Sequence, residues 1–469
     1  MERLFLYLHY LLFLFHCQNR MFLVVRVFAS QKILFLFAWL SVLLVLALYA
    51  GLTPLARWQG DEYGLGVMLR EQGLAGVLGR ITSWSPRPIG EMVSASYLWL
   101  ADWHGTPLVA PFLLAVWGGA VALLWWAGRV SHQAKAGLLA CVLLAVSLLL
   151  CGQAEMFYWP MGAASYVPCW ATLAAASILH RGDATRHRWV MVFVLVAAAW
   201  SQEAGALTVL IYTMACMVLY GVRTSRYGRA MCFPFLAAAF VVLVNATHRL
   251  GTKSEVFDPA SGLGGHWMPS MLKATRSFLF EILHIPGLSL WVSLAVIVFL
   301  LIFMLGQNRE VPRNRACWLW IGALLGGAYS TIVLGYYEFG TLCCTRHNNL
   351  REAAYFLALV TLGGVTVSSR MRAVTYGALI AALACLLAYR LPDIRADWQM
   401  RQQVIADRAD TWQSGHGAGQ AMTLYMPPTG HVTNSDSLMT GEFDLATAPW
   451  WVEGILHYFH KQHLTLVWR

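Results

Sequence analysis

Long apolar runs separated by short polar segments make up most of this chain. A helix needs about 20 apolar residues to cross the hydrocarbon core of a bilayer. Runs near that length occur at 33–53, 107–127, 136–152, 166–180, 189–201, 204–221, 231–247, 288–306, 316–335, 352–368 and 373–390. The pattern therefore predicts an all-α polytopic membrane protein with about eleven transmembrane helices.

Basic residues between these runs predict the orientation. Five short connecting loops carry them: Arg129 and Lys135; Arg181, Arg186 and Arg188; Arg223, Arg226 and Arg229; Arg309, Arg313 and Arg315; and Arg370 and Arg372. If the chain has eleven transmembrane helices, all five loops lie on the same side of the membrane. The positive-inside rule predicts that this side is cytoplasmic. The longer polar segments then lie on the opposite side, here called the exported face.

The first exported segment, residues 54–106, has its own helical pattern. Apolar residues recur at helical spacing at Leu65, Met68, Leu69, Leu74, Val77, Leu78 and Ile81. Gly73 interrupts the pattern, which predicts two short helices. Such helices either lie in the headgroup plane or pack on the helix bundle.

Three regions follow from these patterns. Residues 1–32 form an N-terminal interfacial segment, or translation starts later, at Met21. Residues 33–390 form the transmembrane module that includes the first exported loop. Residues 391–469 form a small exported C-terminal domain. Turn-forming stretches such as "PPTG" and "TNSDS" indicate that this domain is α/β or irregular.

Composition supports the membrane assignment. The chain is 58% hydrophobic and 12% charged, whereas soluble domains carry about 25% charged residues. The net charge of +10 raises the question of nucleic-acid binding. Because the basic residues are dispersed in short loops between apolar runs, we predict no nucleic-acid partner.

Several common catalytic and transport motifs are absent from the sequence. It has no GxxxxGK[ST] loop, which argues against an ATP-driven pump, and neither HExxH nor GxSxG. Carboxylates in the middle of apolar runs are scarce, although ion-coupled carriers usually need them. The end of an interfacial helix explains the spacing of His457, His460 and His463 as well as a metal site does. We predict no cofactor and no metal.

Charged residues of both signs gather in the exported segments. The acids are Asp61, Glu62, Glu91, Asp102, Glu155, Glu203 and Glu338, and the bases include Arg57, Arg80, Arg87, Arg249, Lys253, Arg346 and Arg351. For any single acid, an ion pair or a solvated position is sufficient explanation. As a group, however, they suggest a wet pocket near the bilayer, suited to an amphiphilic substrate with an anionic head.

The adjacent acids Asp61 and Glu62 are the candidate catalytic groups. A lipid-linked sugar keeps its tail in the bilayer and its phosphate at the interface. A carboxylate near the sugar C1 can take the proton from an acceptor hydroxyl while C1 develops oxocarbenium character. A neighbouring acid or partial burial raises the pKa of such a base toward a usable range. In an extended segment only one of the two side chains needs to face the pocket.

An acidic pair in the first exported loop, followed by interfacial helices, resembles the GT-C superfamily of polytopic glycosyltransferases. The stretches "GDEYG" (60–64), "SWSPRP" (83–88), "GQAEMFYWPMGAASYVP" (152–168) and "NATHRLG" (245–251) are similar to bacterial membrane proteins allied to O-antigen-modifying glucosyltransferases. The resemblance implies a polyprenyl-phosphate sugar donor, an acid of this loop as catalytic base, and activity without a bound metal. Asp61 corresponds best to the base.

Four arginines are candidate substrate-binding residues, because the planar guanidinium forms paired bonds with phosphate. Arg87 lies between two prolines and is held stiffly. Arg346 and Arg351 lie in "TRHNNLREAAYF", and Arg249 lies in "NATHRLG". Contact with lipid headgroups is the alternative explanation for Arg87, Arg346 and Arg351.

The remaining substrate-binding candidates are Glu155, Tyr158, Trp159 and Glu203. The first three could line a sugar pocket in which Trp159 stacks on a pyranose ring, or belong to an interfacial aromatic belt. Glu203, in the turn "SQEAG", could orient an arginine or a sugar hydroxyl, or cap the following helix.

The expected function is therefore transfer of a sugar from a polyprenyl-phosphate donor to a glycan or lipid-linked glycan acceptor. We expect the protein in a bacterial inner membrane, in contact with lipids, with its active face in the periplasm. Two alternatives remain: an O-antigen ligase or polymerase, and a lipid or glycan transporter. A ligase usually depends on Arg and His in a large late loop, and a transporter needs charges within the membrane.

Overall fold

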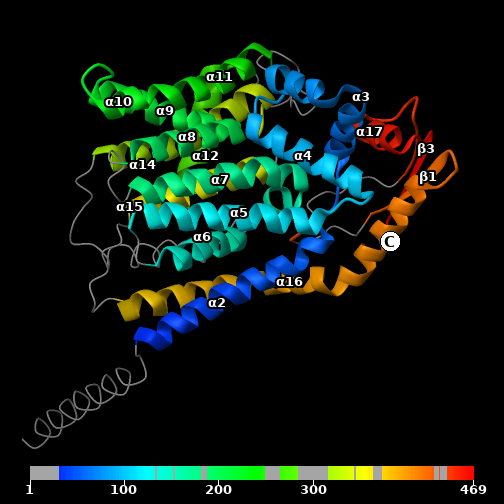
Figure 1. Ribbon diagram of the computed structural model, residues 1–469, viewed down its shortest axis with the longest axis horizontal. Helices are drawn as coiled ribbons and strands as arrows, with labels where there is room; N and C mark the ends of the chain where they lie inside the picture. The colour runs from blue at the N-terminus through cyan, green and yellow to red at the C-terminus, as the bar shows by residue number, and fades with distance from the viewer. Residues whose placement is uncertain are drawn as a thin grey trace, which may run out of the picture.

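The computed structural model describes residues 31–132, 135–150, 154–180, 187–248, 263, 265–283, 315–342, 345–362, 372–426, 432–433 and 441–468. These residues form a bundle of helices with one small sheet near the C-terminus (Figure 1). The first half contains α2 (Gln31–Leu52), η1 (Thr53–Leu55), α3 (Gly60–Ser83), α4 (Pro88–His104), α5 (Val109–Val130), α6 (Ala136–Leu150), η2 (Ala154–Tyr158), α7 (Pro160–His180), α8 (Arg188–Ser201) and α9 (Glu203–Tyr220). The second half contains α10 (Arg226–Ala230), α11 (Cys232–His248), α12 (Trp267–Leu283), α14 (Arg315–Phe339), α15 (Thr345–Leu362), α16 (Arg372–His416), β1 (Ala421–Met426), β2 (Gly441–Asp444), α17 (Trp450–Phe459) and β3 (His463–Trp468).

Seven helical segments in the described part of the chain are long and apolar enough to cross a membrane: Lys32–Leu55, Val109–Val130, Pro160–His180, Glu203–Tyr220, Arg226–Thr247, Arg315–Phe339 and Tyr376–His416. This confirms the prediction of an all-α membrane protein. The predicted number of eleven is not confirmed. Helices α6 and α8 are apolar but shorter than a span, and α15 begins with the polar stretch "TRHNNLRE". The predicted helix at 288–306 and residues 1–30 lie outside the described residues.

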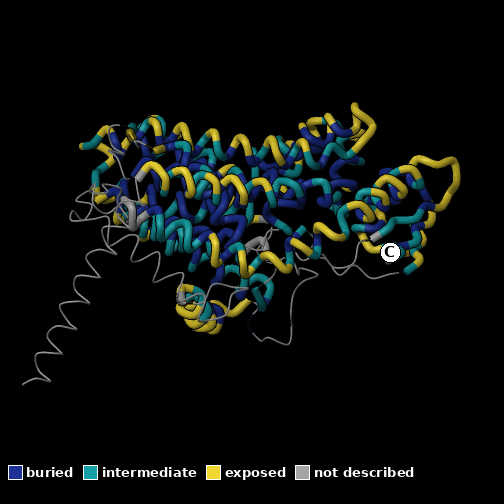
Figure 2. Tube along the Cα trace, turned by 90° about the horizontal axis from the view of Figure 1, so that it is seen from below, coloured by how far each residue is buried: buried dark blue, intermediate teal, exposed yellow. Residues whose placement is uncertain are grey.

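Large apolar side chains cover the outside of the bundle. On α2, Leu36 and Leu40 are exposed, as are Phe193 on α8 and Leu236 and Leu243 on α11. Figure 2 shows buried residues concentrated inside the bundle and exposed ones along its outer helices. A soluble surface rarely exposes large apolar areas, so the exposed side chains agree with the apolar helices of a membrane protein.

Helix α7 lies at the centre of the bundle. Nearly all of its residues are buried, and α5, α8, α4 and α15 pack around it. Its sequence alternates alanines such as Ala163, Ala171 and Ala175 with the large Tyr166 and Trp170. Small residues let neighbouring helices approach closely. The start of α7 therefore becomes the place where several helices meet.

Helix α3 contains the break predicted at glycine. Gly73 has φ 58° and ψ −146°, and its backbone is not helical. This conformation is open to glycine and strained for other residues. On either side of the break Leu65 and Val77 are buried, whereas Leu74 and Leu78 are exposed. The apolar residues therefore do not form one continuous buried face.

The C-terminal segment forms a three-stranded sheet in the order β1-β3-β2, with β1 parallel and β2 antiparallel to β3. Helix α17 packs on α3. Glycines make this contact possible: an added Cβ would lie 2.6 Å from Trp451 Cβ at Gly60, 2.9 Å from the Tyr458 ring at Gly66, and 3.2 Å from Gly64 N at Gly454. Helix α3 and the C-terminal segment are thereby joined.

The two ends of the bundle differ in character. Helix α10, which carries Arg226 and Arg229, lies at one end, while α3, α17 and the sheet lie at the other (Figure 1). Helix α16 runs beside α2 and continues past the bundle to the sheet. The predicted domain boundary at residue 390 therefore falls inside a continuous helix. Which end faces the cytoplasm stays a prediction.

Candidate active site

Glu62 is completely buried at the start of α3. Its Oε2 accepts hydrogen bonds from the backbone N–H of Gln59 at 2.8 Å and from Trp159 Nε1 at 3.0 Å. Its Oε1 accepts a third from the backbone N–H of Met161 at 3.0 Å. The Gln59 bond is half of a capping box. Glu62 therefore fastens the start of α3 to the start of α7.

Burial raises the pKa of Glu62 to about 8, although the three donated bonds favour the charged form. The Glu62 carboxyl is thus protonated near neutral pH and has no exposed surface. A general base must reach the proton that it removes. Glu62 is therefore suited to holding the loop in place rather than to contacting a substrate.

Asp61, the preceding residue, is half-buried. It lies in the first turn of α3, where the partial positive charge of the helix terminus stabilises a carboxylate. The two acids, which follow one another in sequence, thus have different environments. Asp61 is the member of the pair that a solute can reach.

A small cavity lies beside this turn. Its lining residues are Leu55, Arg57, Trp58, Gln59, Gly60, Tyr63, Pro107, Val404, Arg408, Thr411, Trp412, Leu424, Tyr425, Trp451 and Ile455. Gln59, Gly60 and Tyr63 flank the acidic pair in sequence, although neither acid itself lines the cavity. Two arginines and no acid are among the described lining residues. We call this space the arginine cavity.

The arginine cavity measures about 50 Å³, which is room for a few water-sized groups. Within the described residues, the one hydrogen bond of Arg408 runs from Nη1 to the backbone carbonyl of Ala56 at 2.6 Å, and no carboxylate pairs with it. Arg57 reaches the same space from the segment between η1 and α3. Two guanidinium groups in so small a space favour an anion of phosphate size.

Arg87, a predicted phosphate ligand, is instead bound by a carboxylate. Its Nε lies 2.9 and 2.8 Å from the two oxygens of Glu203, at the start of α9. Its guanidinium also lies 6.0 Å from the centre of the Tyr166 ring. The structure thus brings the predicted residues Arg87 and Glu203 together, and Glu203 orients the arginine. A phosphate would have to compete with this ion pair.

Arg351 has a similar environment. It is almost fully buried and donates to both oxygens of Glu281 on α12, from Nε at 3.1 Å and Nη2 at 3.0 Å. The Tyr355 hydroxyl donates to the same carboxylate at 3.0 Å, and Asn348 accepts a further bond from Arg351. This network joins α12 to α15, and Arg351 lines neither described cavity.

The predicted sugar-pocket residues lie at the junction before α7. Tyr158 is fully buried and donates to the backbone carbonyl of Tyr49 on α2 at 2.7 Å. Trp159 is buried against Glu62. Glu155 is half-buried in η2. None of the three lines either described cavity.

Two predicted residues cannot be placed. Arg249 lies outside the described residues, as does the side chain of Arg346, whose backbone begins α15. In the described ranges, no group of three or more His, Cys, Asp or Glu side chains is arranged to hold a metal ion. No protein family, curated protein or solved structure matches this chain.

Arg408 is the residue that sequence reasoning missed. It lies in the polar helical stretch "RQQVIADRADTWQ" (401–413), where a basic residue looks like part of a solvated face. It reaches the segment between η1 and α3 only because α16 continues beyond the bundle. No local pattern reveals a contact between residues about 350 positions apart, such as Arg408 and Ala56.

Proposed function

We propose that this protein is a membrane glycosyltransferase that takes a sugar from a polyprenyl-phosphate-linked donor. The acceptor is a glycan or lipid-linked glycan on the exported face, which is the periplasmic face if the membrane is a bacterial inner membrane. One observation supports the proposal above others: the half-exposed Asp61 begins the helix that borders a cavity containing two arginines and no described acid.

The proposed reaction assigns a separate role to each of these groups. The Asp61 carboxylate takes the proton from an acceptor hydroxyl, whose oxygen forms a bond to C1 of the donor sugar. The bond between C1 and the phosphate oxygen breaks, and the electron pair leaves with the polyprenyl phosphate. Arg57 and Arg408 stabilise the charge that develops on that phosphate. Glu62 holds Asp61 in position through its bonds to Trp159 and Met161.

Asp61→Asn tests the proposal. In a strain lacking the gene, we expect wild-type protein to restore sugar incorporation into surface glycan. Asp61→Asn should lower the rate by about 10²–10⁴-fold, which is the usual contribution of a general base. Incorporation of labelled sugar is the measurement, with the amount of folded protein in the membrane quantified in parallel.

Glu71→Gln is the matched control. Glu71 lies on the same helix and is exposed, so its substitution removes the same charge without touching the acidic pair. We expect it to transfer sugar at the wild-type rate. Full activity of the Asp61→Asn protein would refute the assignment of Asp61 as the base. A transporter would tolerate both substitutions.

A further inference from the structure

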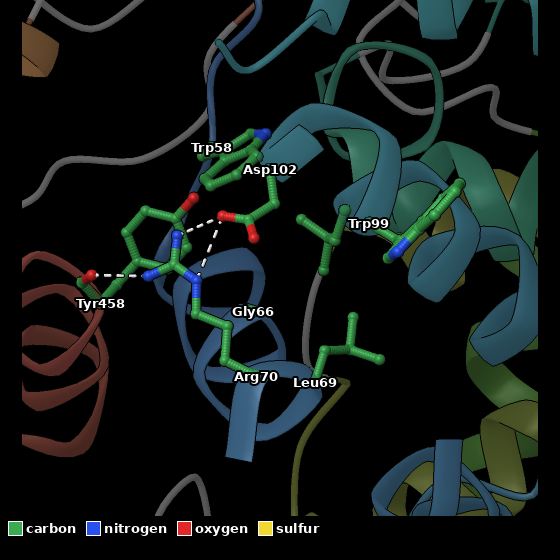
Figure 3. A pocket seen from close by; sticks show the side chains of 8 residues that line it. Trp58, Gly66, Leu69, Arg70, Trp99, Asp102 and Tyr458 are labelled. Atoms are coloured by element: carbon green, nitrogen blue, oxygen red, sulfur yellow. Dashed lines mark hydrogen bonds and ion pairs between the residues drawn. The ribbon is translucent and has the colours of Figure 1, made fainter. Parts of the chain in front are cut away.

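A second cavity lies between α3, α4 and α17. It measures about 200 Å³, and its lining residues are Trp58, Gly66, Leu69, Arg70, Leu98, Trp99, Asp102 and Tyr458 (Figure 3). The arginine cavity is also lined by Trp58. The indole of Trp58 is buried and forms part of both walls. We call this second space the tryptophan cavity.

The charged groups of the tryptophan cavity neutralise each other. Arg70 donates from Nε at 3.1 Å and from Nη2 to the same oxygen, Oδ1, of Asp102. Its Nη1 donates to the backbone carbonyl of Tyr458 at 2.9 Å, and its guanidinium lies 4.0 Å from the centre of the Tyr458 ring. Figure 3 shows this arrangement on one side of the cavity.

This arrangement disfavours an ionic ligand. A cationic ligand would find the Tyr458 face already covered by a guanidinium and the acid already paired. An anionic ligand would find Arg70 bound to a carboxylate. A neutral polar ligand does not have to displace either partner of the ion pair, because it can donate a hydrogen bond to a carboxylate oxygen of Asp102. Both bonds from Arg70 go to Oδ1, and the Asp102 side chain is still 45% exposed. Its other oxygen, Oδ2, can therefore accept from a ligand hydroxyl.

The opposite wall is aromatic and apolar. Trp99 on α4 is 68% exposed and lies across the cavity from the ion pair, and Leu69 lies below it in the view, nearer to Arg70 (Figure 3). A pyranose ring has the matching chemistry. Its C–H groups pack on an indole face while its hydroxyls form hydrogen bonds at the rim. The volume is about four times that of the arginine cavity, which suits one sugar ring.

We propose that the tryptophan cavity binds a neutral hexopyranose unit. Trp99 provides the stacking surface, and Asp102, held by Arg70, accepts from the sugar hydroxyls. That this sugar belongs to the acceptor glycan rests on the proposed function. The shared wall at Trp58 places the bound sugar next to the arginine cavity, where the donor phosphate would lie.

Binding is tested directly, without any transfer assay. The full-length protein in lipid nanodiscs is mixed with methyl glucopyranoside, methyl galactopyranoside and methyl mannopyranoside. Saturation-transfer NMR then detects ring protons in contact with the protein. We expect at least one of the three sugars to show transfer, and Trp99→Ala to reduce the signal at least about fivefold, as expected for loss of an aromatic contact worth ~1 kcal/mol or more.

The matched control is Trp103→Ala. Trp103 lies one turn further along α4 and is 76% exposed, yet it does not line the cavity. We expect this variant to keep the wild-type signal. Asp102→Asn should also reduce the signal, and its thermal unfolding shows whether the protein remains folded. Equal loss in the Trp99 and Trp103 variants would overturn the proposal, because it would indicate a general aromatic belt.

The same experiment separates this proposal from the proposed catalytic function. Asp61→Asn protein should bind the sugar normally, whatever its transfer activity. If none of the three sugars binds wild-type protein, the tryptophan cavity is not a sugar site, even if Asp61 is essential for transfer. Glycerophosphocholine is measured in the same way. If saturation transfer from the protein reaches its protons but those of none of the sugars, the cavity is a lipid headgroup site and the proposal is overturned.

Discussion

Ionisable side chains serve different purposes in two regions of this protein. Around α7 and α15, Arg87 and Arg351 are each bound by a carboxylate, and Glu62 is closed in by three donors. At the end of the molecule where α3 meets α17, Arg408 faces a cavity, and its described bond goes to a backbone carbonyl. Paired, buried charges fasten helices together, whereas a cavity-facing charge can meet a ligand.

This difference changes which residues are expected to act on a substrate. Sequence position alone made Arg87 and Arg351 good candidates for binding a phosphate. Their carboxylate partners now make them candidates for stability instead, because removing one member of a buried pair leaves an uncompensated charge. In the proposed function, the two arginines that line the arginine cavity bind the substrate instead. Substitutions in the two regions should therefore affect different measurements.

The largest effect is expected for Arg351→Gln. The change removes the guanidinium that neutralises the mostly buried Glu281 carboxylate. The hydrogen bond from the Tyr355 hydroxyl to this carboxylate remains. Breaking a buried pair in this way costs about 3–5 kcal/mol. We expect a clear fall in the thermal unfolding temperature of the purified protein in detergent.

A double variant distinguishes the ion pair from simple loss of packing. In Arg351→Gln/Glu281→Gln the unpaired charge is gone, so the protein should be more stable than the single variant. If Arg351→Gln unfolds at the wild-type temperature, the Arg351–Glu281 pair does not hold α12 to α15. The contrast between the two regions would then disappear.

A smaller effect, on activity rather than stability, is expected for Arg408→Gln. A charge-assisted bond to phosphate contributes about 1.5–3 kcal/mol, so sugar transfer should fall about tenfold to a hundredfold. The free energy of unfolding should change by less than for Arg351→Gln, because one hydrogen bond to a carbonyl is lost and no carboxylate is left unpaired. Labelled-sugar incorporation and thermal unfolding measure the two quantities.

Arg401→Gln is the control for this substitution. Arg401 lies on the same helix and also donates to a backbone carbonyl, that of Gly51 at 3.3 Å, but it does not line the cavity. We expect normal transfer from this variant. Equal losses of sugar transfer in the Arg401 and Arg408 variants would mean that transfer depends on the positive charge of α16 in general. The arginine cavity would then have no special role.

Much of the fold could be predicted because its signals are local. Apolar runs gave the helices, and Gly73 gave the break in α3, since only the residues within a few turns decide those features. The site could not be predicted in the same way. Glu203 is 116 positions from Arg87, and Glu281 is 70 positions from Arg351. Whether a charge is paired depends on such distant partners, which a pattern in one segment does not contain.

The acidic pair shows the same limit at the level of a single residue. The residue pattern left Asp61 and Glu62 as equal candidates, and the family resemblance alone favoured Asp61 as the base. Burial of Glu62 depends on Trp159 and Met161, about 100 positions further on. Only the packing of α3 against the start of α7 distinguishes the accessible acid from the buried one.

The last expected effect is a pH dependence of stability that belongs to Glu62. Its pKa is about 8 in the folded protein and about 4.5 when unfolded. Between these values the folded state binds more protons than the unfolded state, so stability falls as the pH rises. The unfolding free energy of wild type minus that of Glu62→Gln should decrease by about 1.4 kcal/mol from pH 6 to 7, and by less per pH unit as the pH approaches the pKa.

Above pH 8 the difference should level off, because the carboxyl is then charged in both states. The Glu71→Gln protein keeps Glu62 and should follow the wild-type profile throughout. Parallel profiles for wild type and Glu62→Gln would mean that Glu62 titrates as an exposed acid does. In that case Glu62 would be accessible to a substrate, and the choice of Asp61 over Glu62 as the base would lose its physical reason.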